Sequence, residues 1–145
     1  MKAVIQRVKN ASVTIDDKLY SKISKGMLIL FCVEKSDTDD KLEWMANKIE
    51  SIRIFEDEQQ KMNLSVKDIK GELLVVSQFT LAASCKKGTR PSFDNAEHPE
   101  IANKMYQKFV EILKTKALNV KTGVFAANMQ VSLINDGPVT FILEK

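Results

Sequence analysis

The sequence is short of the residues and motifs on which most familiar enzyme sites are built. Its 145 residues include one histidine, His98, and two cysteines, Cys32 and Cys85. There is no Gly-x-Ser-x-Gly motif for a serine nucleophile, no His-Glu-x-x-His motif for zinc and no glycine-rich phosphate loop. The cysteines are far apart and have no CxxC spacing, so they do not suggest a zinc site. A catalytic triad, a metal centre and a cofactor are therefore not predicted.

His98 and the two cysteines have simple structural explanations. His98 directly precedes Pro99, where an exposed residue at the start of a helix is expected. Cys32 lies in an apolar run, which favours a buried core thiol. Cys85 lies in a polar segment without a nearby base, and a catalytic thiol needs such a partner.

Glycine, proline and long apolar runs are also scarce. Five glycines and three prolines are too few for a disordered or low-complexity tract. No apolar run approaches transmembrane length, and the chain does not open with a leader pattern, so we expect no signal peptide and no membrane partner. The expected absence of a signal peptide and the low number of cysteines together indicate a cytoplasmic protein. The length suits one domain, residues 1–145, with a single core.

The charge balance neither requires nor excludes a nucleic-acid partner. The chain has 22 Lys and Arg against 19 Asp and Glu, a net charge of +3. A dedicated electrostatic binder is usually far more basic. Three cations nevertheless gather in one short segment, at Lys86, Lys87 and Arg90. This segment is either a solvated loop or a place where phosphates are contacted.

Apolar periodicity predicts a sheet with two helices. The run at 27–33 is continuously apolar, which is typical of a central strand buried on both faces. Residues 3–15 form one strand, or two with a hairpin turn near Lys9 and Asn10. Further strands are expected at 20–23, 52–55, 73–81, 119–122, 129–133 and 139–143, and helices at about 39–50 and 99–116. Because most strand pairs should be antiparallel, the predicted class is α+β, a sheet-rich fold with two main helices.

The polar end of the strand at 73–81 is the first candidate site. Alternation along a strand places Gln78 and Thr80 on the same face, near the strand's C-terminal end. An amide and a hydroxyl can hold a carbonyl or an oxyanion without changing their own protonation. A polar strand end whose groups are simply hydrogen-bonded is the more common explanation of such a pair.

The connector between the last two predicted strands is the second candidate. It contains Asn135, Asp136, Gly137 and Pro138, all of which favour a hairpin turn. Glycine would also let the backbone approach a ligand closely, and proline would fix the shape of the segment. Composition alone favours the turn.

Several collinear segments make the chain resemble the D-aminoacyl-tRNA deacylase family, of the D-tyrosyl-tRNA deacylase type. The resemblance covers residues 3–8, 48–55, 61–65 and 88–93, and two signature motifs appear intact. These motifs are Ser77-Gln78-Phe79-Thr80-Leu81 and Asn135-Asp136-Gly137-Pro138-Val139-Thr140. The chain departs from the family at Ala126 and Asn128, where glycine and aspartate are frequent, and this affects the expected adenosine pocket.

The resemblance implies an activity and an assembly. The family hydrolyses the ester bond of D-aminoacyl-tRNA and releases free amino acid and tRNA, a proofreading of chirality that needs no cofactor. It is a homodimer that associates through the sheet and active-site region, with both sites at the subunit interface. The partners implied are a tRNA carrying a D-amino acid or glycine and a second copy of the chain.

The resemblance also implies roles for individual residues. The catalytic segment comprises Ser77, Gln78, Phe79 and Thr80. A cis Gly137-Pro138 bond would enter the partner's site and exclude L-aminoacyl groups sterically, and Met129 would line the substrate site. Asn135 is a supporting residue, while Arg7 either supports the Gly137-Pro138 segment or is an exposed strand arginine.

Two questions of mechanism follow. A steric filter should not reject glycine, so glycyl-tRNA is expected to be a substrate. Thr80 has no obvious base beside it, which favours participation of the terminal ribose 2′-hydroxyl of the tRNA over a threonine nucleophile. The competing interpretations are a non-enzymatic nucleic-acid-binding module and a stand-alone editing domain similar to that of threonyl-tRNA synthetases.

Overall fold

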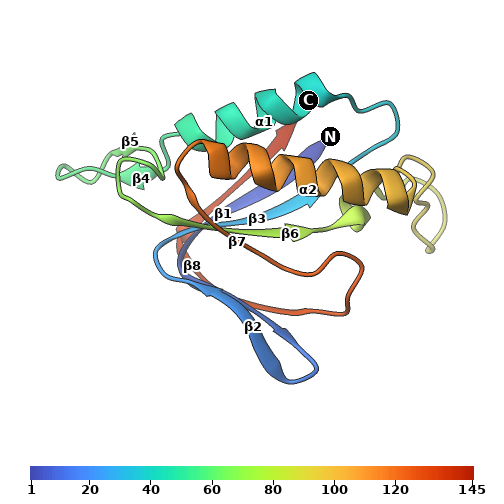
Figure 1. The fold of residues 1–145 in the computed structure, drawn as a ribbon, viewed down its shortest axis with the longest axis horizontal. Coiled ribbons are helices and arrows are strands. Elements are labelled where there is room, and N and C mark those ends of the chain that lie inside the picture. Colours follow the sequence, from blue (N-terminus) through green and yellow to red (C-terminus); the bar gives the residue numbers. More distant parts are fainter.

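A six-stranded sheet with two helices across one face forms the frame of the protein, and the computed structural model describes all residues from 1 to 145 (Figure 1). The helices are α1 (Asp39–Ser51) and α2 (Pro99–Thr115), with a short 3₁₀ helix, η1, at Phe79–Ala82. The sheet contains β1 (Lys2–Ile15), β2 (Lys18–Ile23), β3 (Gly26–Cys32), β6 (Glu72–Ser77), β7 (Asn119–Thr122) and β8 (Gln130–Glu144). A separate pair consists of β4 (Phe55–Glu56) and β5 (Met62–Leu64).

The strand order places the N-terminal and C-terminal strands of the chain side by side. The order is β2-β1-β3-β6-β7, and β8 pairs with the free side of β1. β1 pairs antiparallel with β2, β3 and β8, whereas β3–β6 and β6–β7 are parallel. The predicted α+β class, with mostly antiparallel pairing and two main helices, is confirmed. Neither helix has the length and apolar character needed to cross a membrane.

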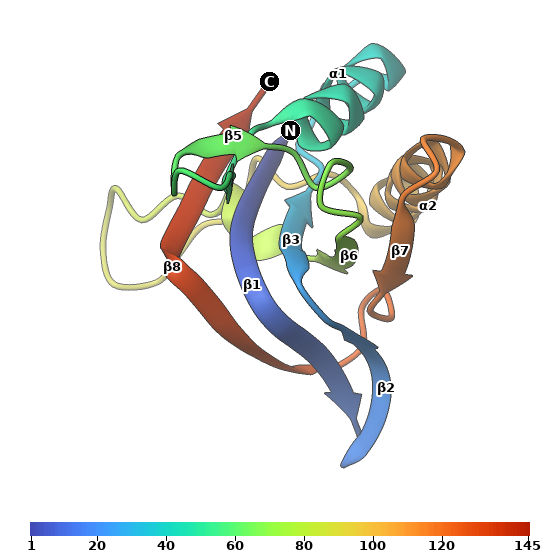
Figure 2. The ribbon, with the colours of Figure 1, turned by 90° about the vertical axis from the view of Figure 1, so that its left-hand side faces the viewer.

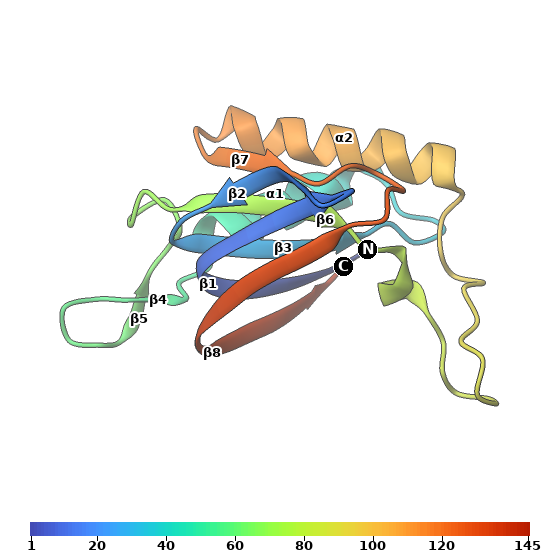
Figure 3. The same ribbon diagram turned by 90° about the horizontal axis from the view of Figure 1, so that it is seen from below.

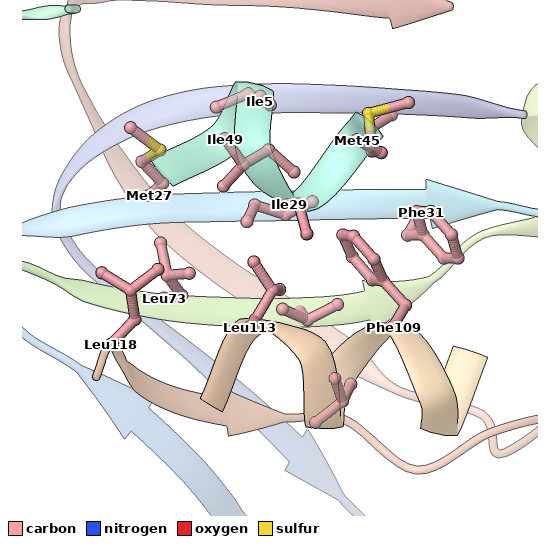
Figure 4. Packing of buried hydrophobic residues seen from close by; sticks show 14 of the residues in the cluster. Ile5, Met27, Ile29, Phe31, Met45, Ile49, Leu73, Phe109, Leu113 and Leu118 are labelled. Carbon is pink, nitrogen blue, oxygen red and sulfur yellow. The ribbon is translucent and has the colours of Figure 1, made fainter. Parts of the chain in front are cut away.

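The central strands are apolar on both faces because both faces are covered. On β3, Met27, Ile29 and Phe31 belong to the cluster beneath the helices, whereas Leu28 belongs to a second cluster on the opposite face. The helices contribute residues such as Ile49 to the first cluster (Figure 4). Alternation in a strand sends successive side chains to opposite faces, so a continuous apolar run was the correct sign of double burial.

The second face is covered by the sheet itself. β1 and β8 are long and curved, and their outer halves bend beneath the sheet together with β2 (Figures 1 and 2). Val8, Ala11 and Val13 from β1 and Ile23 from β2 pack there against Leu74 and Val76 of β6. This curvature leaves one end of the sheet open, where β3 and β6 finish.

Of the two alternatives for residues 3–15, the single strand is confirmed, because pairing with β8 continues on both sides of Lys9 and Asn10. The hairpin predicted near the C-terminus is wrong. The strands at 129–133 and 139–143 do not pair with each other but are halves of β8, both paired with β1. The segment between them bulges out opposite Arg7, where the register shifts.

Three smaller predictions also need correction. The strand predicted at 52–55 is reduced to Phe55–Glu56, and residues 62–64, predicted as loop, pair with it as β5. The strand predicted to reach residue 81 ends at Ser77, where the chain turns into η1. Both helices lie within one residue of the predicted bounds.

Candidate functional site

A cleft of about 730 Å³ opens at the end of the sheet where β3 and β6 finish. The start of α2, η1 and the loop between β7 and β8 meet at the same end of the molecule (Figure 1). Of the 21 lining residues, 14 are hydrophobic, which suits the recognition of an organic group by burial with a few polar contacts. Residues that line it include Val76, Ser77, Gln78, Phe79, Phe93, Tyr106, Phe125 and Met129.

Gln78 and Thr80 are close together, but not for the reason the strand pattern suggested. The strand has already ended, and Thr80 lies in the 3₁₀ turn η1 that follows Gln78. The Nε2 amide of Gln78 donates a hydrogen bond of 2.5 Å to Oγ1 of Thr80. The backbone N–H of Gln78 donates to the carbonyl of Phe31 at 2.8 Å, which anchors the turn to the end of β3. The strand prediction was wrong here, because a tight turn brought the side chains together instead of alternation.

The Thr80 hydroxyl has one side-chain partner, the Gln78 amide, which donates. No titratable side chain is hydrogen-bonded to it, and Gln78 and Thr80 carry no charge themselves. Because the Gln78 N–H occupies an acceptor position of the oxygen, the hydroxyl hydrogen remains available to a ligand. This arrangement suits the holding of an acceptor group, such as an ester carbonyl, better than nucleophilic attack by Thr80.

The cleft interior contains residues that the sequence did not identify as lining a site. Tyr106 of α2 is buried and donates from its hydroxyl to the carbonyl of Val75 at 2.9 Å. Cys32 is buried, as predicted, and lies at the cleft wall, where burial raises the pKa of its thiol to about 11. Glu97 and His98 also line the cleft, although His98 was interpreted only as an exposed residue before a helix. The position of His98 directly before α2 indicated only weakly that it would lie at the rim of the cleft.

The loop between β7 and β8 closes one side of the cleft. Met129 lies in its wall, and the sulfur of Met129 accepts a contact of 3.4 Å from the backbone N–H of Val124. Ala126, where the family often has glycine, has a φ of +60°. That conformation is the one in which glycine is easiest to accommodate, so the substitution keeps the turn at a local cost. Asn128 lines the cleft as well.

The Gly137-Pro138 segment is held firmly at its base and exposed at its tip. Its peptide bond is cis, and both residues are exposed. Arg7 is 5% exposed and donates from Nε to the carbonyl of Asp136 at 2.7 Å and from Nη1 to the carbonyl of Ile54 at 2.8 Å. Its Nη2 is 3.2 Å from a carboxylate oxygen of Glu56. Arg7 is therefore a buried support of the segment and not an exposed strand arginine.

Asn135 fixes the other side of the same segment. Its Oδ1 accepts a 2.7 Å hydrogen bond from the backbone N–H of Val139, and its amide donates to Thr140 Oγ1 at 3.0 Å. A Cβ at Gly137 would lie 3.2 Å from Nη2 of Arg7 and 2.6 Å from Cγ2 of Val139, at a φ of +147°. Only glycine fits this position without displacing its neighbours.

The structure does not bring the two signature motifs together within one chain. Neither Gly137 nor Pro138 lines the cleft that contains Gln78. The two residues lie in the middle of β8, the strand that also carries the exposed apolar residues Phe141 and Ile142. Within the monomer, the cleft and the Gly137-Pro138 segment are separate features.

The basic segment is a loop closed at its base. Ser84 and Ser92 form a two-way backbone bridge, with N–H to carbonyl distances of 2.8 and 3.0 Å. Lys86, Lys87 and Arg90 lie on the exposed loop between them, and none forms an ion pair within 4.0 Å. The loop projects from the end of the molecule where α2 begins (Figure 3), and the start of α2 lines the cleft.

Comparisons with known proteins identify what this arrangement is similar to. The sequence model of the family described as D-Tyr-tRNA(Tyr) deacylase matches residues 4–144. A D-aminoacyl-tRNA deacylase of Flavobacterium psychrophilum is 58% identical over 99% of this chain and 97% of its own length. One of Persephonella marina is 59% identical, with the same coverage of both chains.

Two solved structures share the fold. A protein titled c-Myc DNA Unwinding Element Binding Protein has a TM-score of 0.95 and is 44% identical, with 100% of this chain and 99% of that chain covered. A structure titled as a probable eukaryotic D-amino acid tRNA deacylase has a TM-score of 0.82 at 15% identity, covering 98% and 97%. The second likeness supports the fold alone.

Proposed function

Because the chain belongs to the D-Tyr-tRNA(Tyr) deacylase family, we propose that it hydrolyses the ester bond of D-aminoacyl-tRNA and releases the free amino acid and tRNA. The observation that carries this proposal is the polar turn of Gln78 and Thr80 at the wall of an apolar cleft. Curated relatives above 50% identity that match almost the whole chain are named D-aminoacyl-tRNA deacylase. Such an enzyme works where charged tRNA is made, so its proposed location is the cytoplasm.

The proposed catalytic segment is Ser77 to Thr80, and it acts mainly by positioning. The Thr80 hydroxyl and the backbone amides of the η1 turn hold the ester carbonyl, because the first N–H groups of a helical turn lack acceptors within the helix. A water molecule attacks the carbonyl carbon, the bond to the ribose oxygen breaks, and that oxygen takes a proton. The ribose 2′-hydroxyl, adjacent to the ester, assists the proton transfer, since Thr80 has no basic partner.

A paired experiment separates substrate assistance from attack by Thr80. D-Tyrosyl-tRNA ending in 2′-deoxyadenosine should lose most of its turnover with the unmodified enzyme. Thr80→Ala should reduce, but not abolish, hydrolysis of the ordinary substrate. Loss of all activity in Thr80→Ala, with full activity on the deoxy substrate, would make Thr80 the nucleophile and overturn the assignment.

The proposed chirality filter is Gly137-Pro138 from a second copy of the chain. The segment is exposed and lies outside its own cleft, while Arg7 and Asn135 hold it in shape. Backbone atoms placed in the partner's cleft would occupy the space that an L side chain needs, whatever that side chain is. Glycine has no side chain to exclude, so glycyl-tRNA is a proposed substrate too.

The filter requires a homodimer. β8 exposes three large apolar side chains on either side of the Gly137-Pro138 segment, with Ile134 52%, Phe141 38% and Ile142 67% exposed. Exposed apolar surface of this kind on a sheet is typical of an interface between subunits. Sedimentation equilibrium should give twice the chain mass, and Ile142→Lys should dissociate the dimer and remove activity with it. A fully active monomer would exclude the shared site.

Lys86, Lys87 and Arg90 are the proposed contacts to tRNA phosphates. Their loop projects beside the cleft and carries no acid between Ser84 and Ser92. Each phosphate contact that is lost should lower the salt dependence of binding by about one unit in the slope of log K against log salt. The Lys86→Ala and Lys87→Ala variants should therefore show shallower slopes than the parent protein.

Two other functions remain to be separated by experiment. The structural relative titled as a DNA unwinding element binding protein favours a nucleic-acid-binding module as the second candidate. A stand-alone editing domain similar to that of threonyl-tRNA synthetases is the third. Binding without hydrolysis of either D- or L-tyrosyl-tRNA would support the module, and hydrolysis of both enantiomers would support an editing domain without a chirality filter.

A further inference from the structure

Two large aromatic rings lie exposed at the rim of the cleft. Phe79 is 59% exposed and Phe93 is 40% exposed. Their ring centroids are 5.0 Å apart and their planes are inclined by 54°. The two rings therefore contact each other while both remain open to solvent, and neither belongs to a core cluster. Phenylalanine is usually buried, so an exposed pair at a site needs an explanation.

The chain positions Phe93 by local hydrogen bonds. It directly follows the Ser84–Ser92 bridge that closes the basic loop. The carbonyl of Phe93 accepts a 2.9 Å hydrogen bond from the N–H of Ala96, which closes the turn beyond it. Phe79 lies in the η1 turn between Gln78 and Thr80. One ring is thus attached to the basic loop and the other to the turn that carries the proposed catalytic groups.

The aromatic pair connects two surfaces of different character. Phe79 and Phe93 both line the apolar cleft, where the esterified end of a tRNA is proposed to bind. Lys86 and Lys87 line a second hollow of about 380 Å³, whose other lining residues, Ser84, Ser92, Asp94 and Asn95, are all polar or charged. The two hollows adjoin in the chain at Ser92 and Phe93, and the cations of the second hollow, Lys86 and Lys87, form no ion pair. An aromatic surface next to positive charge is the arrangement that binds single-stranded nucleic acid, because the bases stack on the rings and the phosphates contact the cations.

We propose that Phe93, supported by Phe79, stacks on the base of the nucleotide that precedes the esterified terminal adenosine, and that the 84–92 loop contacts its phosphate. The inference rests on the proposed deacylase function and identifies how the enzyme holds the single-stranded 3′ end. Stacking accepts any base, since every base has a π face. The platform therefore contributes affinity for many tRNAs without selecting among them.

The test compares two substrates that differ only in this nucleotide and what lies beyond it. D-Tyrosyl-tRNA has the preceding nucleotide, whereas D-tyrosyl-adenosine, esterified on its ribose, lacks it. Phe93→Leu keeps apolar volume but removes the ring. It should raise KM for D-tyrosyl-tRNA about 5- to 150-fold, the range for one stacked base, with a small change in kcat. The ratio of kcat/KM on tRNA to kcat/KM on D-tyrosyl-adenosine should fall by the same factor.

Two further variants control for general effects of substitution. Phe93→Trp retains a stacking ring and should keep the ratio within a few-fold of the parent value. Tyr20→Leu removes an aromatic ring on β2 that is 53% exposed and does not line the cleft, and it should not change the ratio. An abasic site at the preceding nucleotide should cost the parent enzyme as much as Phe93→Leu, and the two changes together should cost little more than either.

The outcomes that overturn the proposal are distinct from failure of the deacylase function. If Phe93→Leu lowers kcat/KM equally on the two substrates, the ring contributes to the ester site or to the fold and not to binding of the preceding base. Additive effects of Phe93→Leu and the abasic site would show that the ring does not touch that base. If the parent enzyme hydrolyses neither D-tyrosyl-tRNA nor D-tyrosyl-adenosine, the proposed deacylase function itself is wrong.

Discussion

Replacement of Arg7 by methionine tests whether the Gly137-Pro138 segment is held from within its own chain. Methionine preserves most of the apolar volume but none of the donors. The guanidinium gives one hydrogen bond to the carbonyl of Asp136, at 2.7 Å, and one to the carbonyl of Ile54, at 2.8 Å. It also faces Glu56 at 3.2 Å, but that carboxylate is half exposed.

The expected cost follows from these contacts. A hydrogen bond from a charged donor contributes about 1.5–3 kcal/mol, so the two carbonyl bonds together contribute about 3–6 kcal/mol. The ion pair with half-exposed Glu56 adds about 0–1 kcal/mol, because solvent screens it. Arg7→Met should therefore lower the free energy of unfolding by about 3–7 kcal/mol. Arg7→Lys retains the charge but reaches fewer acceptors, and should lose about half as much.

Urea unfolding monitored by circular dichroism gives these values. The matched control is Lys9→Met, which removes a cation that is mostly exposed and 4.0 Å from Asp136. It should change stability by no more than about 0.5 kcal/mol. In Arg7→Lys, which should still fold, the D/L ratio of tyrosyl-tRNA hydrolysis should fall as the segment loosens. A loss below about 1 kcal/mol in Arg7→Met, or an unchanged ratio in Arg7→Lys, would refute this reasoning.

Three further predictions concern the frame of the cleft. Tyr106→Phe removes the 2.9 Å bond to the Val75 carbonyl, which still accepts from the Gly123 N–H at 3.0 Å, and should therefore cost only about 0.5–1.5 kcal/mol in urea unfolding; a loss above about 3 kcal/mol would contradict this reasoning. Gly26→Ala places a Cβ 1.9 Å from the carbonyl oxygen of Glu72 on the paired strand and should cost about 3 kcal/mol or more, whereas Gly88→Ala, with open space and a φ of +65°, should cost about 1–2 kcal/mol. A reversed order would contradict the β3–β6 pairing. Burial raises the pKa of Cys32 to about 11, so iodoacetamide at pH 8 should label exposed Cys85 alone, and both cysteines in urea. Labelling of both cysteines under native conditions would disprove the burial. The pKa of Cys32 in the folded state lies above its value in the unfolded chain, so the neutral thiol favours the folded state. The free energy of unfolding should therefore fall as pH rises from about 9 to about 11.

The central strands and helices were predictable because their patterns are local. Seven consecutive residues of β3 had to be covered on both faces, and apolar composition alone indicates this. The helix at Asp39–Ser51 follows from the recurrence of Leu42, Met45, Ala46 and Ile49, all of which are buried. On α2 the apolar periodicity is a weaker guide to burial, since Ile101 is exposed whereas Tyr106 and Val110 are buried.

The long strands could not be recognised from their own residues. Lys9 and Asn10 are typical of a turn, yet β1 continues through them because β8 satisfies its backbone. The same pairing turns the Asn135–Pro138 connector from a hairpin into a bulge. Strand continuity here depends on a partner more than 100 residues away in the chain, which periodicity does not reveal.

The candidate site was found for partly incorrect reasons. Strand alternation predicts that Gln78 and Thr80 share a face. In the structure they meet because the backbone hydrogen bond from Gln78 to the Phe31 carbonyl anchors a tight turn, which brings the two side chains together. Arg7 was ambiguous because its acceptors, on Ile54 and Asp136, are distant in sequence. The exposed rings of Phe79 and Phe93 gave no local signal, since exposure is decided by the tertiary fold.

Initial rates of hydrolysis of D-tyrosyl-tRNA and L-tyrosyl-tRNA by the same purified protein test the central claim most directly. The account predicts rapid release of D-tyrosine, measurable release of glycine from glycyl-tRNA, and release of L-tyrosine no faster than in buffer. Equal rates for the two enantiomers would contradict the chirality filter formed by Gly137 and Pro138. No hydrolysis of D-tyrosyl-tRNA would contradict the deacylase function itself.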